Sequence, residues 1–558
     1  MNILKSNEAY DVVVIGAGLA GIKAAVTAAQ KGCRVLLCSK SILCAGSSFY
    51  TLMDTLHCQA VIDEADKEVF LRDIADCSYG MNDPVMNRYY ADHIRERITE
   101  LPAMGIPYEK LPEPKLACFA GHPHDLYYWS DWNAIRVRLT DILEQNPSIT
   151  FREKTEAAAI AVGGDKAVSG VILYDKRRGV FEYVPCASLI LATGGFGALY
   201  KHNLNSPDVA GDGHALALAA GASLINLEFN QFIPGLLKPV YKVVFREGTL
   251  DYCDALLDRQ GHDILREALP DTAEYAECLR IRASHGPFTS AGPSMHFDLA
   301  MMKACEDDPD SEGAVIQYSP KMERDTRSYV AGYLQWLKET YRVNLCTEKV
   351  TIAPFFHAAN GGILVDHRCE TEVRGLFACG EAAGGIHGAD RLGGNASGSC
   401  LVFGYLAAES AAAHAKQVSG KGCDIPANEL SRLLEDVYGT AETSAATPQE
   451  VIAQIREEMW LRANVLRSEE SLLTALASVQ KLRAAYHASA FFGKAEQIPA
   501  AMQAQRFLTL SQAILTAMRN RTESRGAHYR EDYPRLDSRF DRRWKIHLRR
   551  GEVLCVPE

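Results

Sequence analysis

The segment Tyr10–Ile15 and the glycines that follow it restrict the possible fold most. The run YDVVVI is apolar except for Asp11, which is typical of a strand buried on both faces of a parallel sheet. It is followed by GAGLAG, an Ala-rich segment over Ile22–Gln30 that favours a helix, and a second apolar strand at Arg34–Cys38. A strand, a glycine turn, a helix and a parallel strand form a βαβ unit. The sequence therefore predicts a dinucleotide-binding domain.

Each glycine of the turn has its own task. Gly16 permits the tight turn, Gly18 lets backbone amides approach a pyrophosphate, and Gly21 lets the helix pack closely on the strand. The helix N-terminus adds positive partial charge to the phosphate site. The acidic residue that usually binds ribose hydroxyls at the end of the second strand is absent, and Ser39 and Lys40 stand there instead. A tight turn without a ligand is the alternative interpretation.

Length and composition indicate the class of protein. A chain of 558 residues exceeds one ordinary core, so two or three domains are expected. The hydrophobic content of 47% and charged content of 23% are those of a soluble globular protein. The net charge of −11 argues against nucleic acid as a partner. The 16 cysteines include no C-x-x-C pair, so we expect neither an iron–sulfur cluster nor another metal site in this chain.

The same cysteines and the N-terminus indicate where the protein works. So many thiols suit a reducing compartment. The start, MNILKSNEAYDVVVIG, lacks the basic and apolar regions of a signal peptide. No uninterrupted apolar run is long enough to span a bilayer. These features predict a cytoplasmic protein without direct membrane insertion.

Further motifs follow the glycine turn in a fixed order. They are LATGGFG at 191–197, AGDGHALALAAGA at 210–222, HAANGGI at 357–363, GLFACGEAAGGIHGADRLGGNASG at 375–398 and ESRGAHYREDYP at 523–534. The ordered set resembles the flavoprotein subunits of fumarate reductase and succinate dehydrogenase, together with L-aspartate oxidase. The resemblance covers nearly the whole chain and implies FAD as the cofactor. It implies an α/β fold with a Rossmann-like FAD-binding domain, an inserted α+β capping domain and a C-terminal helical domain.

Domain boundaries follow from composition and from this resemblance. We expect the FAD-binding domain at 1–232 and 350–427, the capping domain at 233–349 and the helical domain at 428–558. In the last domain, apolar residues recur at helical spacing over 455–465 and 472–484. The Arg-rich segment 519–550 is expected to be a solvated face with local salt bridges, and a partner surface is the alternative.

The resemblance extends the cofactor site beyond the glycine turn. Respiratory members attach FAD covalently to a His after the second strand, but no His occurs between Lys40 and Tyr50 here, so FAD is expected to bind non-covalently. The paired glycines that follow in the family are replaced by Met53 and Asp54. A helix starting near Asn395 should stabilise the anionic reduced flavin with its N-terminal amides. The residues implied to bind FAD are Gly16, Gly18, Gly21, Ser39, Lys40, Ser47, Ser48, Thr193, Gly194, Asp212, Glu381, Ala396 and Ser397.

The family moves a hydride between the flavin and a carbon beside the one that bears a carboxylate. Such a site needs cations for the acid, a proton donor and exclusion of water. His357 and Arg391 match the residues that hold one substrate carboxylate, a task that suits Arg. Arg282 lies at the offset of the proton-transfer Arg, although the Pro and Asp of that motif are missing and Arg280 is a competitor. Glu247 matches the relay glutamate, with a surface charge as the alternative.

Two departures from the family concern the substrate. Residues 231–235 read QFIPG instead of Q-F-H-P-T, so Ile233 replaces a His that binds the second carboxylate. Arg246 replaces the Thr before the relay Glu. A buried carboxylate without a partner costs several kcal/mol, which disfavours fumarate, succinate and aspartate unless Arg246 replaces the lost donor. A monocarboxylate with an apolar tail, or an acid with a larger group, fits Ile233 better.

The leading hypothesis is an FAD-dependent oxidoreductase for a small carboxylic acid. It would interconvert a saturated acid and its 2-enoate, or oxidise an amino acid to its imino acid. The alternatives are an L-aspartate oxidase-like amino-acid oxidase and a flavin-binding electron-transfer protein with a degenerate catalytic site. A separate iron–sulfur or ferredoxin-like carrier, a free nicotinamide and oxygen remain open as redox partners.

Overall fold

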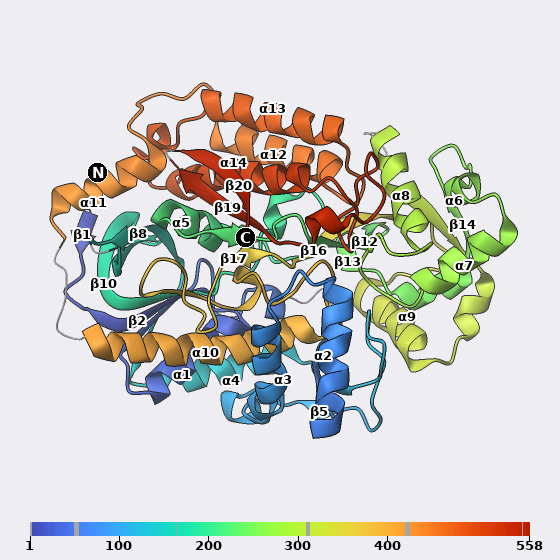
Figure 1. Cartoon of the computed structure of the whole chain (residues 1–558), viewed down its shortest axis with the longest axis horizontal. Coiled ribbons are helices and arrows are strands. Elements are labelled where there is room, and N and C mark those ends of the chain that lie inside the picture. The colour runs from blue at the N-terminus through green and yellow to red at the C-terminus, as the bar shows by residue number, and fades with distance from the viewer. Residues whose placement is uncertain (1–2, 50–54, 165, 308–312, 419–424, 550) are drawn as a thin grey trace.

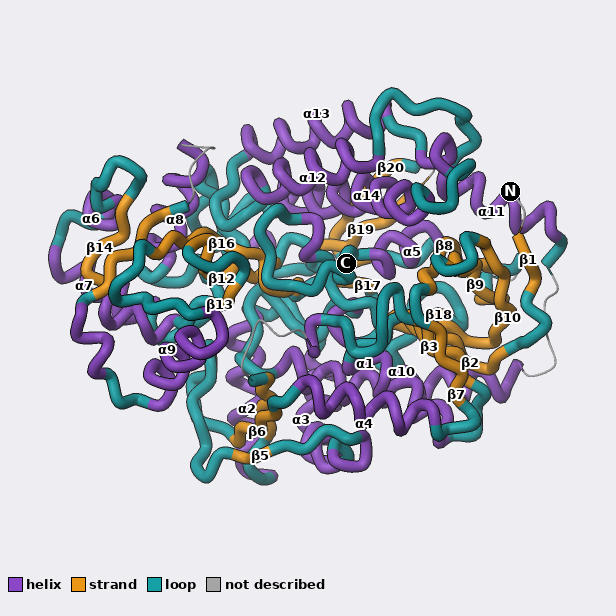
Figure 2. The backbone as a smooth tube through the Cα atoms, turned by 180° about the vertical axis from the view of Figure 1, so that it is seen from behind, coloured by secondary structure: helices purple, strands orange, loops and turns teal. Residues whose placement is uncertain are grey.

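An eight-stranded sheet forms the centre of the FAD-binding domain (Figures 1 and 2). The computed structural model describes residues 3–49, 55–164, 166–307, 313–418, 425–549 and 551–558. The sheet order is β7-β3-β2-β10-β9-β8, and β1 and β18 also pair with β10. These strands are β1 (Ile3–Lys5), β2 (Tyr10–Ile15), β3 (Val35–Cys38), β7 (Ile149–Arg152), β8 (Thr155–Val162), β9 (Val168–Asp175), β10 (Val180–Leu191) and β18 (Leu376–Ala378).

Strand β10 changes partners halfway along its length. Residues 180–185 pair antiparallel with β9, and residues 186–191 pair parallel with β2. The last part also pairs parallel with β18. The carboxyl ends of β2, β10 and β18 therefore meet at one edge, which is where ligands bind in sheets of this kind.

Helices cover both faces of this sheet. Helices α1 (Leu19–Gln30) and α10 (Asn395–Val418) pack together on one face (Figure 1). A Cβ at Gly404 would come 2.8 Å from the Ala20 carbonyl oxygen, so glycine permits this close approach. Helix α5 (Asp212–Ala220) contacts β8 and α14 (Ile498–Asn520). The domain also contains α2 (Glu64–Ser78), α3 (Pro84–Thr99), α4 (Trp132–Glu144) and a small sheet of β4 (Leu56–Ala60), β5 (Glu109–Lys110) and β6 (Asp125–Trp129).

The capping domain has its own sheet and its own apolar core. The order is β13-β12-β16-β15-β14. Strand β12 begins before the predicted boundary at residue 233, and β16 pairs with it although the prediction places residues 350–359 in the FAD-binding domain. The elements are β12 (Asn230–Lys238), β13 (Val243–Val244), β14 (Cys253–Leu257), β15 (Ala314–Tyr318), β16 (Val350–Ala359), α6 (Ile264–Ala268), α7 (Thr272–Arg282), α8 (Met295–Asp307) and α9 (Ser328–Tyr341).

The C-terminal region is helical and then returns to the first domain. Helices α11 (Ala427–Tyr438), α12 (Pro448–Arg462) and α13 (Glu469–Ala485) precede α14, and the two segments with predicted helical spacing fall largely in α12 and α13. Capping boxes at Thr447 and Ser468 start these two helices. A hairpin of β19 (Trp544–Arg549) and β20 (Glu552–Pro557), which the sequence did not suggest, extends the pair β11 (Leu224–Ile225) and β17 (Gly362–Ile363).

The Arg-rich segment is not a solvated face throughout, which corrects the expectation. Arg521, Arg525 and Arg530 are buried. Arg521 Nε donates to Glu228 Oε1 at 2.6 Å, and its Nη1 donates to Glu523 Oε1 at 2.8 Å. Arg525 Nε donates to the same Glu523 oxygen at 2.7 Å. Buried carboxylates thus hold these guanidiniums inside: Glu523 lies within the segment, whereas Glu228 comes from a distant part of the chain, and spacing within the segment gives no sign of it.

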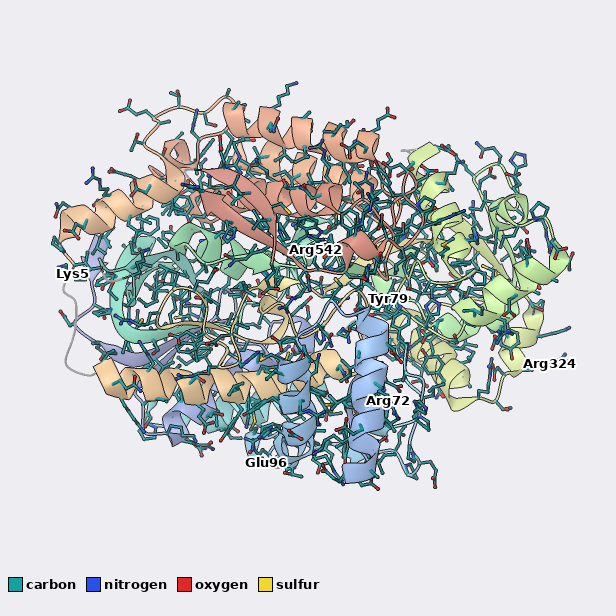
Figure 3. All side chains as sticks on the ribbon, viewed as in Figure 1. Lys5, Arg72, Tyr79, Glu96, Arg324 and Arg542 are labelled. Atoms are coloured by element: carbon teal, nitrogen blue, oxygen red, sulfur yellow. The ribbon has the colours of Figure 1, made fainter. Side chains whose placement is uncertain are left out.

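This ion network lies in the middle of the molecule. Arg525 Nη1 donates to the carbonyl of Tyr79, the residue that ends α2, and Arg521 Nη2 donates to the carbonyl of Arg542. Figure 3 shows Tyr79 and Arg542 at the centre of the view, where the C-terminal segment meets the FAD-binding domain. The last part of the chain is therefore bound to the first.

Glu523→Gln should lower the free energy of unfolding by about 3–5 kcal/mol, because two buried guanidiniums would lose a charged partner. Urea unfolding followed by circular dichroism measures this loss. Arg88→Gln is the control, since Arg88 pairs with Glu68 on the surface and exposed pairs contribute less than about 1 kcal/mol. Equal, small losses in both variants would contradict a structural role for the network.

Candidate active site

A cavity of about 110 Å³ opens at the carboxyl edge of the large sheet. Its walls come from the glycine turn, the ends of β3 and β10, and the start of α5. Most of the residues predicted to bind FAD line it, namely Gly16, Gly18, Ser39, Lys40, Ser47, Ser48, Thr193, Gly194, Asp212 and Glu381. Met53 and Asp54 lie outside the described residues.

The three glycines of the turn differ in their surroundings. Gly16 has φ +112°, and a Cβ there would lie 2.2 Å from the Ala192 carbonyl oxygen. A Cβ at Gly21 would lie 1.8 Å from the Gly16 carbonyl oxygen, so Gly21 serves packing and does not line the cavity. A Cβ at Gly18 would meet no atom within 4 Å, because this residue faces open space. Of these three glycines, Gly18 is the one with open space at its Cβ position, so a ligand can approach the backbone there.

An ion cluster occupies the end of β3, where the usual acid is absent. Lys40 Nζ donates to Asp212 Oδ2 at 2.8 Å and lies 3.7 Å from Glu156 Oε2. Arg506 Nη1 donates to Asp212 Oδ1 at 2.8 Å. Burial opposes ionisation of Asp212, but Lys40 and Arg506 outweigh it and hold the pKa of Asp212 well below its usual range. Sequence reasoning missed Glu156 and Arg506, since neither lies in a recognisable motif.

A second cavity of about 290 Å³ adjoins the first. Ser47, Ser48 and Glu381 line both cavities, so the two share a wall. Ala396 and Ser397, in the first turn of α10, line the second cavity, and Ser397 Oγ donates to the His57 carbonyl at 2.6 Å. The start of α10 thus borders the larger cavity.

His357 and Arg391 both line this second cavity. Arg391 Nη2 donates to Gln231 Oε1 at 2.7 Å, and its Nη1 donates to the Leu392 carbonyl at 3.2 Å. Burial lowers the pKa of His357 to about 3, and the charge of Arg391 acts in the same direction. His357 is therefore neutral at pH 7, and this pair offers a carboxylate one full positive charge.

A bulge in the capping sheet directs His357 into the cavity. Gln231 pairs with Ala358 and Phe232 pairs with Phe356, so His357 is the extra residue between them. Asn205 Nδ2 donates to the His357 carbonyl at 2.9 Å and also to Ser47 Oγ at 3.3 Å. The bulge is thereby tied to a loop that borders the cofactor cavity.

The capping side of the cavity is part apolar and part polar. Ile233 lies in an apolar stretch with Leu204, Val244 and Phe245, whereas Arg246, Glu247 and Tyr329 form a polar group. Gly286 lies between the two, since a Cβ there would be 3.7 Å from Ile233 Cδ1 and 3.8 Å from Glu247 Oε2. Sequence reasoning missed Tyr329, which lies outside every motif.

Arg282 lines neither cavity, in contrast to its predicted role as proton donor. It is fully buried, and its Nε and Nη2 donate to both Asp298 oxygens at 2.6 and 3.1 Å. Nη2 also donates to the Gly286 carbonyl at 2.9 Å, and Nη1 donates to the His285 carbonyl. Arg282 ends α7 and is drawn toward α8 by Asp298, so its guanidinium fixes the loop beside the cavity instead of entering it.

The residues present fit an FAD molecule. Gly18 leaves room at the helix N-terminus, and the two cavities share a wall. Thr193 Oγ1 is buried at the first cavity without a hydrogen-bond partner among the described residues, which a ligand there would supply.

Comparison with known proteins shows the class to which the chain belongs. The family model described as FAD binding domain matches residues 11–397, and the model described as fumarate reductase flavoprotein C-term matches residues 452–550. The chain belongs to the FAD-binding flavoprotein family of fumarate reductase and L-aspartate oxidase, and it is an FAD-dependent oxidoreductase.

The similar proteins include both L-aspartate oxidases and fumarate reductase subunits. L-aspartate oxidase of Vibrio cholerae is 27% identical over 542 residues, with 94% of this chain and 96% of the relative covered. The fumarate reductase flavoprotein subunit of Escherichia coli is 24% identical over 554 residues, with 94% of this chain and 88% of the relative covered. The structure of Mycobacterium smegmatis Sdh1 in complex with UQ1 superimposes with a TM-score of 0.82 at 24% identity, covering 100% of this chain and 94% of that one, and shows the same fold.

Two further findings concern membranes and metals. Within the described residues, no helix has both the length and the apolar character needed to cross a bilayer. The same residues contain no group of three or more His, Cys, Asp or Glu side chains placed to hold a metal ion.

Gly18→Ala should weaken FAD binding at least about tenfold while leaving the apoprotein as stable as before, because the added methyl points into the cavity. Gly21→Ala should instead destabilise the apoprotein, because its methyl would overlap the Gly16 carbonyl. Flavin fluorescence titration and thermal unfolding of the apoproteins separate the two effects. Unchanged FAD affinity in Gly18→Ala would show that the cofactor does not approach this turn.

Stability should fall as the pH drops below about 6.5, because burial lowers the pKa of His202 and His214 to about 4 and of His285 and His357 to about 3. In this pH window these histidines are protonated in the unfolded chain but not in the folded chain. Each histidine therefore lowers the free energy of unfolding by about 1.4 kcal/mol per pH unit. Glu306, whose pKa burial raises to about 7, acts in the opposite direction. Urea unfolding between pH 5 and 6 tests this, and His214→Asn should reduce the slope by one histidine's share.

Proposed function

We propose that the protein interconverts a saturated carboxylic acid and its 2-enoate, and that the substrate carries an apolar group where fumarate has its second carboxylate. The observation that carries this proposal is the position of Ile233 in the cavity wall, beside Leu204 and Val244. Ile233 is only 7% exposed and packs in one apolar cluster with Phe355 and Trp460. A second carboxylate at this point would be desolvated without a donor from these apolar neighbours.

The other end of the cavity supports recognition of one carboxylate. Arg391 is held by Gln231 and by the Leu392 carbonyl, so its guanidinium is oriented before a substrate arrives. Neutral His357 adds one N–H donor. Together they would bind the acid and place its neighbouring carbons between the capping domain and the cofactor.

FAD, when bound, supplies the hydride acceptor or donor. The chain's own residues exclude water and hold the acid: Phe245 and Pro287 line the cavity from the capping domain, and the Arg282–Asp298 pair fixes the loop that carries Pro287. We propose that FAD is bound without a covalent link and that a separate iron–sulfur or ferredoxin-like protein exchanges electrons with it.

An amino-acid oxidase is the second candidate. Glu247 places a carboxylate at the cavity, where it would suit a substrate ammonium, and the relative from Vibrio cholerae is an L-aspartate oxidase. Oxygen consumption with amino acids, measured on the oxidised holoenzyme, tests this candidate directly.

Ile233→His should transfer reactivity from apolar enoates to fumarate. The photoreduced holoenzyme, kept anaerobic, is mixed with crotonate, cinnamate or fumarate, and reoxidation is followed by flavin absorbance. The wild type should react with an apolar enoate and at least about a hundredfold more slowly with fumarate, because an unpaired buried carboxylate costs several kcal/mol. Ile233→His should reduce the ratio of the reoxidation rate with the apolar enoate to the rate with fumarate. Ile233→Val is the control, because it keeps the wall apolar. Fast reoxidation of the wild type by fumarate would overturn the proposed specificity.

A further inference from the structure

We infer that Tyr329 exchanges the proton with the substrate carbon in this reaction, an inference that rests on the proposed function. Tyr329 is the second residue of α9, in the capping domain, and it lines the larger cavity together with Arg246 and Glu247. Tyr329 belongs to the capping domain, whereas the residues that line both cavities belong to the FAD-binding domain. A proton donor is needed on the capping-domain side when the hydride comes from the cofactor.

Four other described residues at or near the cavity are less suited to this task. Arg282 is enclosed by Asp298 and two backbone carbonyls and does not reach the cavity. Cys118 Sγ accepts the Gly286 N–H at 3.3 Å, and burial raises the pKa of its thiol to about 11. His357 and Arg391 hold the substrate acid in the proposed arrangement.

Two cations lie beside the Tyr329 ring. Arg246 Cζ lies 5.0 Å from the ring centroid and Lys115 Nζ lies 5.5 Å from it. Two cations at this distance offset part of the charge that a tyrosine acquires when it gives up its proton, although burial and Glu247 keep the pKa of Tyr329 raised. Lys115 comes from the FAD-binding domain, so both domains contribute to this environment.

Hydrogen bonds connect the phenol with its neighbours. Burial and the negative charge of Glu247 raise the pKa of Tyr329 above its ordinary value, and Arg246 opposes this shift. The phenol forms side-chain hydrogen bonds with both residues. Tyr329 is therefore protonated at rest, and Glu247 is placed to return a proton to it.

The ring is also held in a fixed position. A Cβ at Gly248 would lie 3.2 Å from two Tyr329 ring carbons, so the ring packs directly on this glycine. Backbone hydrogen bonds between Lys115 and His124, at 2.9 and 3.2 Å, fix the loop that brings Lys115 to the ring. Such positioning is what a general acid requires.

The proton and electron balance is complete. In the reducing direction, FAD when bound would supply a hydride to the double-bond carbon farther from the carboxylate, and the π pair would shift to the double-bond carbon next to the carboxylate. The Tyr329 O–H bond breaks as a C–H bond forms at that second carbon. The enoate gains two electrons, the flavin loses two, and solvent restores the phenol proton through Glu247. The reverse reaction runs these steps backward.

The test uses the photoreduced holoenzyme and crotonate under anaerobic conditions. Tyr329→Phe should slow flavin reoxidation at least about a hundredfold, since general acid catalysis contributes that much. The dissociation constant of crotonate, read from the spectrum of the oxidised flavin, should change less than about threefold, because the carboxylate site is intact. Tyr275→Phe is the matched control, a capping-domain tyrosine whose hydroxyl makes only long contacts of 3.4 and 3.5 Å.

A second variant tests whether slow reoxidation in Tyr329→Phe comes from loss of the phenol or from a general loss of structure. Gly248→Ala keeps the phenol but displaces its ring, and it should slow reoxidation at full FAD content with unchanged crotonate affinity. A rate within about threefold of wild type in Tyr329→Phe would overturn the inference while leaving the proposed function intact. A wild-type holoenzyme that reacts with neither crotonate nor cinnamate would overturn the proposed function, and the inference with it.

Discussion

The antiparallel ladder between β12 and β16 is the constraint on which the rest of the site depends. These two strands carry the chain into the capping domain and back. Along one short stretch they place Gln231 against Arg391, put Ile233 in the apolar wall and turn His357 into the cavity at a bulge. A slip of one residue in this register would reverse all three side chains. Substrate recognition is therefore encoded in strand pairing as much as in residue identity.

The cavity is electrically asymmetric. Arg391 provides a full positive charge at one end, whereas burial keeps His357 neutral. Arg246 and Glu247 both line the cavity and carry opposite charges, so together they contribute little net charge, and Ile233 contributes none. A molecule with one negative group and an apolar remainder matches this distribution better than one with two negative groups.

Local sequence predicts some levels of this structure well and others poorly. The strand at 10–15 and the glycine turn could be predicted because one short motif contains the strand, the turn and the start of the helix. The structure places β2 and α1 there. The orientation of the Arg282 side chain could not be predicted, because it depends on a hydrogen bond to Asp298, sixteen residues later. Tyr329 was missed for a related reason, since its ring packs on Gly248, which lies 81 residues earlier in the chain. Pairing between distant segments leaves no periodic trace in a single sequence.

The turn at 526–527 has a consequence for how the protein matures. The Gly526 carbonyl accepts the Ser290 N–H of the capping domain at 2.7 Å, and the Ala527 N–H donates to the Ala389 carbonyl, two residues before Arg391, at 3.1 Å. A segment made late during translation thus joins both sides of the cavity. All strands of the large sheet are made by residue 378, but the contacts that join both sides of the pocket for the acid must wait until residues 526 and 527 have been made. During synthesis, the segments that form the core sheet are therefore made well before the segment that completes the site.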